Sequence, residues 1–462
     1  MPSRRASKLA ALVGGTLVTV VVSVLLGFNR LQIAALSSIV FMTLGIILYW
    51  EYKVPAAAFG LFLLFLTGAL DIHTFIEHAH LDVIMFLVGM MIIVEYLERT
   101  AFFEHIIGYL RRHLCRTALS LITVFYFMTA LFSSLVGVLT AVLFMIPMIL
   151  ELALRYRVNP IPLVLLMVFA ANIGSSATVV GNPVGILIAL GGDLTFFDFI
   201  RWATPITATS LLVSLGLGLA IFRRDLRALD LAMSQYPPDA FFHKKISRSE
   251  LVKAWGVFLG VITAIAMHEV IEEALGLAKG SMLLASSIGG SAVVMLLVGR
   301  ERIHEIIEEG VDWTVLLFFI FLFSSIGTLE KVGITKMIAN YVKTLSYGSE
   351  LTLLLTVSIT AAGLSAVLDN VLTVAFFIPI IKYLEQMGVH VYPLWCGLLF
   401  ASTYFGNFTV IASTANIVAV SLLEARKVGT VSFVDWLKYG PIFSVVPLAI
   451  ALLLLWLQIP LM

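Results

Sequence analysis

The stretch Gly363-Leu-Ser-Ala-Val-Leu-Asp369-Asn370-Val-Leu-Thr-Val-Ala-Phe-Phe-Ile-Pro379 decides how the rest of the chain is interpreted. It places an aspartate and an asparagine in the middle of a long apolar run. A charged side chain at the centre of a bilayer costs about 3 kcal/mol or more, and such a residue is usually kept for a function. Asp369 is therefore the first candidate site residue. A structural role, as a helix cap or as the partner of a lysine, is the alternative.

The composition of the chain indicates the class of protein. Of 462 residues, 60% are hydrophobic and 12% are charged, whereas an ordinary soluble domain has about 25% charged residues. The long apolar runs suit membrane helices of about 20 residues better than barrel strands of about 10. The formal net charge of +1 argues against a nucleic-acid partner. We therefore predict an all-α polytopic membrane protein.

Motifs for an enzyme or a metal site are missing from the sequence. It has no phosphate-binding Gly-x-x-x-x-Gly-Lys-Ser/Thr motif, and His268-Glu269 lacks the second histidine of a zinc-protease motif. The two cysteines, Cys115 and Cys396, fit neither a disulfide framework nor a metal-binding spacing. We expect no catalytic residues, no metal and no cofactor.

Two pairs of adjacent apolar segments are joined without a polar loop, the first at residues 136–137 and the second at residues 369–370. A turn in water would normally carry several polar residues. Each pair is therefore predicted to form a re-entrant hairpin, over 117–151 and 351–384, whose tip ends inside the membrane.

Basic residues predict the orientation, because Lys and Arg collect in cytoplasmic loops. Arg4, Arg5 and Lys8 place the N-terminus inside, and the basic segment 223–253 then also falls inside. Residues 9–28 are interpreted as a retained helix, because no cleavage site follows them. The count gives about eleven transmembrane helices plus the two hairpins, one entering from each face.

The sequence also contains an internal repeat. Residues 133–147 align with residues 365–379 at a shift of 232 positions, from Gly137 to Asp369, and residues 174–180 align with 405–411 at a shift of 231. The two copies enter the membrane in opposite orientation, as in the inverted repeats of secondary transporters. The predicted organisation is an extra helix in 1–31, a first repeat in 32–222, a cytoplasmic linker in 223–253 and a second, inverted repeat in 254–462.

Small and polar residues interrupt the predicted helices 161–190 and 393–423. Unwound backbone at membrane depth is tolerated where it lines a cavity or binds something. For a single Ser or Thr, helix packing is the competing explanation, but two interruptions in matching positions favour a binding site. The candidate substrate-binding residues at the tips and interruptions are Ser133, Ser134, Asn172, Ser175, Ser176, Thr178, Asn182, Asn370, Thr373, Asn407, Thr409, Ser413, Thr414 and Asn416.

Asp369 is the candidate for proton coupling. Burial favours the neutral carboxyl group and a bound cation favours the carboxylate, so this side chain could exchange a proton for a substrate.

The hairpin tip and the interrupted helix together resemble the ion transporter superfamily. Within it they are most similar to the branch of arsenite/antimonite permeases (ArsB), the melanosomal P protein and NhaD-type sodium/proton antiporters. The resemblance rests on residues 87–94, 365–379 and 171–183, and covers about residues 80–460. The chain departs from the branch at Gly137-Val138, where Asp-Asn is common. It departs again at residues 182–185, Asn-Pro-Val-Gly, where the branch has Asp-Pro-Pro-Asn.

The resemblance implies a multi-pass transporter of the cytoplasmic membrane. The leading hypothesis is proton-coupled efflux of arsenite or antimonite by alternating access, because an uncharged trihydroxy solute needs only hydroxyl and amide partners. The alternative is a sodium/proton antiporter that uses Asp369 with carbonyl and hydroxyl oxygens. A carrier of dicarboxylates or other small anions, or a channel, comes third. The expected partners are the lipid bilayer, the solute, protons and, from the resemblance, a second copy in a homodimer. A cytosolic pump ATPase is left open.

Overall fold

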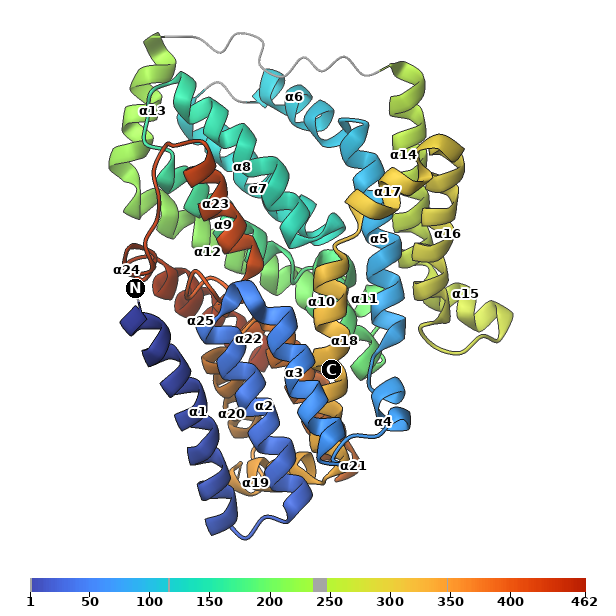
Figure 1. Cartoon of the computed structure of the whole chain (residues 1–462). Coiled ribbons are helices and arrows are strands. Elements are labelled where there is room, and N and C mark those ends of the chain that lie inside the picture. Colours follow the sequence, from blue (N-terminus) through green and yellow to red (C-terminus); the bar gives the residue numbers. More distant parts are fainter. Residues whose placement is uncertain (1, 115–116, 236–246, 347) are drawn as a thin grey trace. The chain divides into compact units, whose positions relative to one another are not determined.

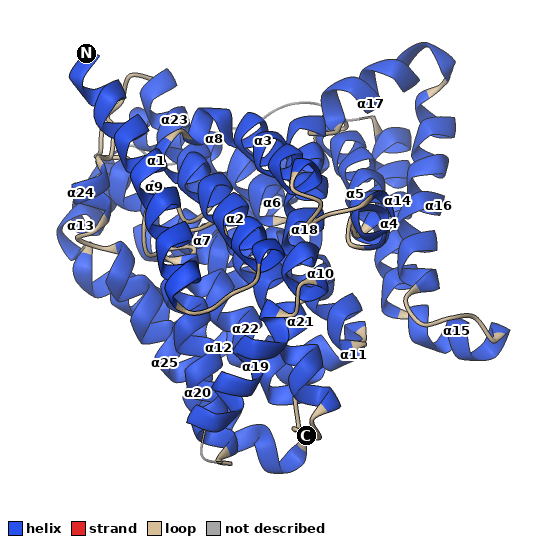
Figure 2. Cartoon of the chain, turned by 60° about the horizontal axis from the view of Figure 1, so that its bottom comes forward, coloured by secondary structure: helices blue, strands red, loops and turns tan. Residues whose placement is uncertain are grey.

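The computed structural model describes residues 2–114, 117–235, 247–346 and 348–462. It is 83% helix, and the described residues contain helices and loops but no strand (Figure 2). Ten helical stretches among them are long and apolar enough to cross a membrane. The predicted all-α polytopic fold is confirmed.

The chain divides into two compact units, and each is described by itself. Unit 1 contains residues 1–85, 312–356 and 375–391, and unit 2 contains residues 86–311, 357–374 and 392–462. All the candidate site residues lie in unit 2. Three helices run from one unit into the other: α5 (Leu81–Arg99), α20 (Glu350–Ser365) and α21 (Asn370–Gln386).

Unit 1 is built from long apolar helices that pack in chain order, with α18 against α3 (Figure 1). Its remaining helices are α1 (Pro2–Leu25), α2 (Arg30–Leu48), η1 (Trp50–Tyr52), α3 (Lys53–Leu66), α4 (Ile72–Glu77), α18 (Trp313–Lys331) and α19 (Ile334–Leu345). Asp312 caps α18 by accepting a hydrogen bond from the backbone N of Val315 at 3.0 Å. Such a cap satisfies one of the N–H groups that a helix start leaves without a partner.

Unit 2 contains the hairpin α7–α8 and the interrupted helices. Its helices are α6 (Phe102–Leu114), α7 (Ala118–Val136), α8 (Val138–Arg155), α9 (Ile161–Gly174), η2 (Val179–Gly181), α10 (Pro183–Gly192), α11 (Phe196–Asp198), η3 (Phe199–Ala203), α12 (Thr204–Ile221), α13 (Arg223–Gln235), α14 (Arg248–Ala266), α15 (His268–Leu275), α16 (Ser281–Val298), η4 (Arg300–Arg302), α17 (Ile303–Gly310), α22 (Tyr392–Phe405), α23 (Thr414–Ala425), α24 (Phe433–Trp436), α25 (Gly440–Gln458) and η5 (Ile459–Leu461). Helix α23 packs against α8 and α9 (Figure 1).

In two segments the structure shows features that the sequence analysis did not describe. The apolar segment 254–275 is not one helix, because α14 ends at Ala266 and α15 begins at His268. Three glutamates lie within α15, and this charge is costly at membrane depth. The segment 223–253 contains α13, an amphipathic helix with Leu229 and Met233 buried on one face. Residues 236–246 of this segment lie outside the described residues.

In both predicted hairpin segments, two helices follow each other with a very short joint. Helices α7 and α8 are joined by the single residue Gly137, which has a φ of 104°. Helices α20 and α21 are joined by residues 366–369. Pro147 and Pro379 lie inside the second helix of their respective hairpins, so the proline follows the tip at the same distance in both halves.

We predict that Gly137→Ala lowers the free energy of unfolding by about 1–3 kcal/mol, because a side chain at this positive φ strains the backbone. Unfolding can be followed through the reaction of a thiol dye with Cys396, which is buried, in a Cys115→Ser background. Gly289→Ala in α16 is the matched control, because both glycines have no neighbouring atom within 4 Å and only Gly137 has a positive φ. Equal melting temperatures for the two variants would contradict the argument.

Candidate functional site

The first interruption separates α9 from α10 at residues 175–182. The chain here folds tightly on itself, since a Cβ atom at Gly181 would lie 2.1 Å from the carbonyl oxygen of Ser175. Asn182 caps α10 by accepting from the backbone N of Gly185 at 2.8 Å, and its Nδ2 donates to Ser175 Oγ at 2.5 Å. Side chains thus replace helix hydrogen bonds that the interruption removes.

The second interruption separates α22 from α23 at residues 406–413. Asn416 Nδ2 donates to the carbonyl oxygens of Gly406 and Thr409, at 2.6 and 2.9 Å. The side chain of Asn416 is fully buried. It adds a donor to the carbonyl oxygen of Thr409, which also accepts from the backbone N of Ala412 at 3.3 Å, and it supplies a donor to that of Gly406.

A buried cluster of side-chain amides joins the two interruptions. Asn172 Nδ2, at the end of α9, donates to Asn407 Oδ1 at 2.8 Å and to Asn416 Oδ1 at 2.9 Å. Ser413 Oγ donates to Asn172 Oδ1 at 3.1 Å. These four side chains are at most 2% exposed. We refer to Asn172, Asn407, Ser413 and Asn416 as the amide cluster.

Each hairpin tip is tied to the helix that carries the interruption of the same half. Ser133 Oγ donates to the carbonyl oxygen of Ala171 at 2.6 Å, and Ser365 Oγ donates to the carbonyl oxygen of Ser402 at 2.8 Å. From Ser133 to Ser365 the shift is 232 positions, and from Ala171 to Ser402 it is 231. These are the two shifts of the sequence repeat.

A second pair of hydrogen bonds recurs in the same way. Thr178 Oγ1 donates to the carbonyl oxygen of Ser134, and Thr409 Oγ1 donates to the carbonyl oxygen of Ala366 at 2.7 Å. In both halves a threonine of the interruption thus binds the backbone beside the hairpin tip. The shared contacts agree with the sequence repeat at the level of individual hydrogen bonds.

Asp369 lies at the start of α21 and is 8% exposed. Its Oδ1 accepts from the backbone N of Val371 at 2.9 Å, so it caps this helix. The structural role that the sequence left open is therefore present. The neighbouring Asn370 has its Nδ2 3.4 Å from the place that a Cβ atom at Gly406 would occupy, so this amide lies beside the second interruption.

The profile of the CitMHS family, described as citrate transporter, matches residues 46–347 and 336–461. The chain belongs to the CitMHS citrate transporter family. This family is part of the ion transporter superfamily, so the broader resemblance is confirmed. The comparisons do not single out the arsenite permease and antiporter branch.

Two relatives of this CitMHS transporter are described as uncharacterized transporters. The "uncharacterized transporter Rv2685" of Mycobacterium tuberculosis is 31% identical over 386 residues, which cover 82% of this chain and 86% of that protein. The "uncharacterized transporter slr0753" of Synechocystis is 27% identical over 345 residues, which cover 69% and 73%. The chain is therefore a membrane transporter with its substrate open.

A solved structure shares the fold of this CitMHS transporter. The YdaH transporter of Alcanivorax borkumensis matches with a TM-score of 0.60 at 17% identity, over 87% of this chain and 90% of that one. Its structure is described as having an unusual topology. At this identity the likeness concerns the fold alone.

The remaining candidate residues surround the amide cluster less directly. Ser176 Oγ lies 2.7 Å from Thr207 Oγ1 of α12 and donates to the carbonyl oxygen of Ile173 at 2.8 Å. Thr373 Oγ1 donates to the carbonyl oxygen of Asp369 at 3.4 Å. Thr414 is the first residue of α23 and is half-buried.

The sequence analysis missed two hydrogen bonds between Asn407 of the cluster and aromatic residues, one through a side chain and one through a backbone carbonyl. Trp436 Nε1 donates to the carbonyl oxygen of Asn407 at 2.8 Å, and Asn407 Nδ2 donates to the carbonyl oxygen of Phe443 at 3.4 Å. Trp436 lies in the short helix α24, outside the interrupted helix. No motif spacing indicated this contact; the only signal was a tryptophan, whose indole N–H usually finds a partner when buried.

The chemistry of the site is polar but nearly uncharged. Residues 133–147, 171–185, 363–379 and 404–416 contain no Lys, Arg or His, and Asp369 is their only acidic residue. The described residues hold no group of three or more His, Cys, Asp and Glu that could bind a metal ion. Such a site can bind a small solute through amides, hydroxyls and carbonyls.

We predict that Asn172→Ala lowers the free energy of unfolding by about 1–3 kcal/mol, because it leaves two buried amide oxygens without their donor. Ser358→Ala is the matched control. Ser358 is fully buried and its hydroxyl group has no hydrogen-bond partner among the described residues, so its removal should cost little. The thiol-dye melting assay measures both variants. A smaller loss for Asn172→Ala than for Ser358→Ala would show that the cluster adds nothing to stability.

Proposed function

We propose that this CitMHS transporter is a proton-coupled secondary carrier that moves a small, oxygen-rich solute by alternating access. The observation that carries the proposal is the amide cluster, in which two interrupted helices meet through buried, neutral side chains. Secondary transporters bind substrate where interrupted helices of inverted repeats meet at the bilayer midplane. The binding residues in this proposal are the amide cluster together with Ser175, Asn182 and Asn370.

Asp369 is proposed as the proton-coupling residue. It is the only carboxylate in the two tips and two interruptions, and it is buried. Burial favours the protonated form, whereas the hydrogen bond from the backbone N of Val371 favours the carboxylate. In this proposal, a change in the surroundings of Asp369 during transport releases or binds the proton.

Arsenite or antimonite is the first candidate substrate, with efflux as the direction. Arsenous acid is an uncharged molecule with three hydroxyl groups at neutral pH, and its hydroxyls can both donate to and accept from amides. The absence of Lys, Arg and His from the tips and interruptions suits an uncharged solute. This substrate assignment rests on the donor set of the site.

Citrate or a dicarboxylate is the second candidate, and two observations favour it. The first is the description of the matching family as citrate transporter. The second concerns α8 and α23, which pack together. Their N-cap residues, Gly137 and Ser413, form no side-chain hydrogen bond that caps the helix. Helix N-termini carry partial positive charge and bind anions, so they could receive carboxylate groups in place of basic side chains.

The proposal includes the orientation and assembly expected from the sequence. The N-terminus and segment 223–253 lie in the cytoplasm, the repeats 32–222 and 254–462 have inverted topology, and two copies form a homodimer. The proton gradient drives transport in this scheme, so a pump ATPase is not required.

Flux into proteoliposomes tests the substrate and the proton role together. We expect a gradient of arsenite or antimonite to drive proton movement, and we expect Asp369→Asn to lower this coupled flux at least about tenfold and to remove its pH dependence. Asp312→Asn is the matched control, because Asp312 also caps a helix through its side chain. Asparagine caps a helix as well as aspartate does, so each substitution removes only the ionisable group.

Other outcomes assign other functions. Proton movement driven by citrate and not by arsenite supports the second candidate, and movement driven by sodium alone supports a sodium/proton antiporter. Normal coupled flux in Asp369→Asn removes the proton role of that residue. A conductance far above carrier turnover would identify a channel.

A further inference from the structure

A second polar cavity, of about 250 Å³, lies in unit 2 away from the amide cluster. It is formed where α5 and α16 end and where α14 begins, and η4 and α17 complete its wall. Its lining residues combine charged, aromatic and aliphatic side chains. They are Tyr96, Arg99, Thr100, Ala101, Glu250, Lys253, Leu297, Val298, Arg302 and Ile306.

The helix ends around the cavity place it at a membrane surface in the predicted topology. Helices α5, α14 and α16 all belong to stretches long and apolar enough to span a membrane, and each contributes residues from its end at the cavity. Their ends face the cytoplasm in the predicted orientation, since α14 follows the basic segment 223–253. Exposed apolar side chains lie beside the cavity on the same helices: Val252, Trp255, Leu296 and Leu297. A lipid acyl chain would contact this surface.

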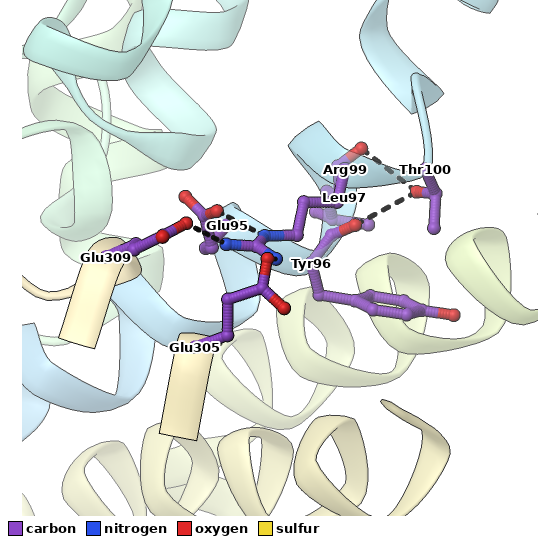
Figure 3. A network of polar contacts seen from close by, with 7 residues as sticks. All are labelled: Glu95, Tyr96, Leu97, Arg99, Thr100, Glu305 and Glu309. Carbon is purple, nitrogen blue, oxygen red and sulfur yellow. Dashed lines mark hydrogen bonds and ion pairs between the residues drawn. The ribbon is translucent and has the colours of Figure 1, made fainter. Parts of the chain in front are cut away.

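Arg99 forms a fixed part of the cavity wall. Its Nε lies 2.5 Å from Glu95 Oε1, its Nη1 2.6 Å from Glu305 Oε1 and its Nη2 2.7 Å from Glu309 Oε2 (Figure 3). Glu305 and Glu309 belong to α17, so this arginine holds α17 against the end of α5. Three carboxylates surround one guanidinium group, and therefore Arg99 does not attract a further anion.

Three other charged residues of the lining are available to a ligand. Lys253, Arg302 and Glu250 form no ion pair among the residues that the structure describes. Lys253 and Glu250 are one turn apart on α14, and Arg302 lies in η4. The cavity thus offers two cations and one anion that form no ion pair with the described residues. It also lies next to exposed apolar side chains.

We propose that this cavity binds the headgroup of a phospholipid that carries both a phosphate and a primary ammonium group, as in phosphatidylethanolamine. Lys253 and Arg302 bind the phosphate, Glu250 binds the ammonium group, and the acyl chains lie along Leu296 and Leu297. Basic pockets between membrane helices on the cytoplasmic side are known to bind lipid headgroups. Glu250 and the excess carboxylates around Arg99 disfavour a headgroup with only negative charge, and therefore the ammonium group is part of the proposal.

This binding would act on η4 and α17, which lie at the end of the segment 86–311 of unit 2. Helix α17 ends at Gly310, and the chain passes from unit 2 to unit 1 after Val311. A headgroup held by Arg302 beside Ile306 stabilises η4 and α17 in their observed places. The inference does not depend on the identity of the transported solute.

Native mass spectrometry of the detergent-purified full chain tests the proposal. The protein is mixed with phosphatidylethanolamine, phosphatidylglycerol or phosphatidylcholine at equal concentration, and the retained lipid is counted. We expect retention of phosphatidylethanolamine above the other two. The double variant Lys253→Gln/Arg302→Gln should lower this retention by about twenty-five-fold, because each basic residue near a membrane surface contributes roughly fivefold to binding.

The variant Glu250→Gln tests the ammonium contact separately. It should keep phospholipid binding but remove the preference for phosphatidylethanolamine over phosphatidylglycerol. Arg426→Gln is the control, because Arg426 is exposed at the end of α23 and is absent from the cavity lining; it should behave as the unmodified chain does.

Three results would overturn the proposal. One is equal retention of all three lipids by the unmodified chain, and another is unchanged retention in the double variant. The third is displacement of the lipid by soluble O-phosphoethanolamine at equal concentration, which would show that the cavity takes a soluble phosphate ester and not a lipid.

Discussion

The hydrogen bonding of backbone groups at the two helix interruptions is the constraint on which the rest of the site depends. A helix that unwinds inside a membrane leaves N–H and C=O groups that water cannot reach. Here asparagine, serine and threonine side chains take that place. Asn182 caps α10, and Asn416 binds the carbonyl oxygens of Gly406 and Thr409. The polar residues of the interruptions are therefore required by the fold before any question of substrate arises.

The hydrogen bonds of the site fall into two classes. Those of Ser133, Thr178, Ser365 and Thr409 lie within one half and tie each hairpin tip to its own interruption. Those of the amide cluster join one half to the other. Two hydrogen bonds thus tie each tip to its own interruption, and three join the two halves in the amide cluster.

The features predicted from the sequence are those that local patterns specify. A joint without polar residues predicted the turns at Gly137 and at Asp369, and the small-residue runs predicted the interruptions to within a few residues. Features that depend on distant contacts were not predicted. Asn172 binds residues more than 200 positions away, and nothing in a single sequence pairs them. The substrate also stays open, because the same neutral donors suit more than one solute.

In the proposed function, the amide cluster has a consequence for how strongly a solute can be held. Asn172, Asn407, Ser413 and Asn416 bind one another in the structure, so a solute that enters must replace hydrogen bonds that the protein already makes. Such an exchange conserves the number of hydrogen bonds, and its net free energy is small compared with the strength of any one bond. A site of this kind favours modest affinity and rapid release, which suits a carrier that has to discharge its cargo in every cycle.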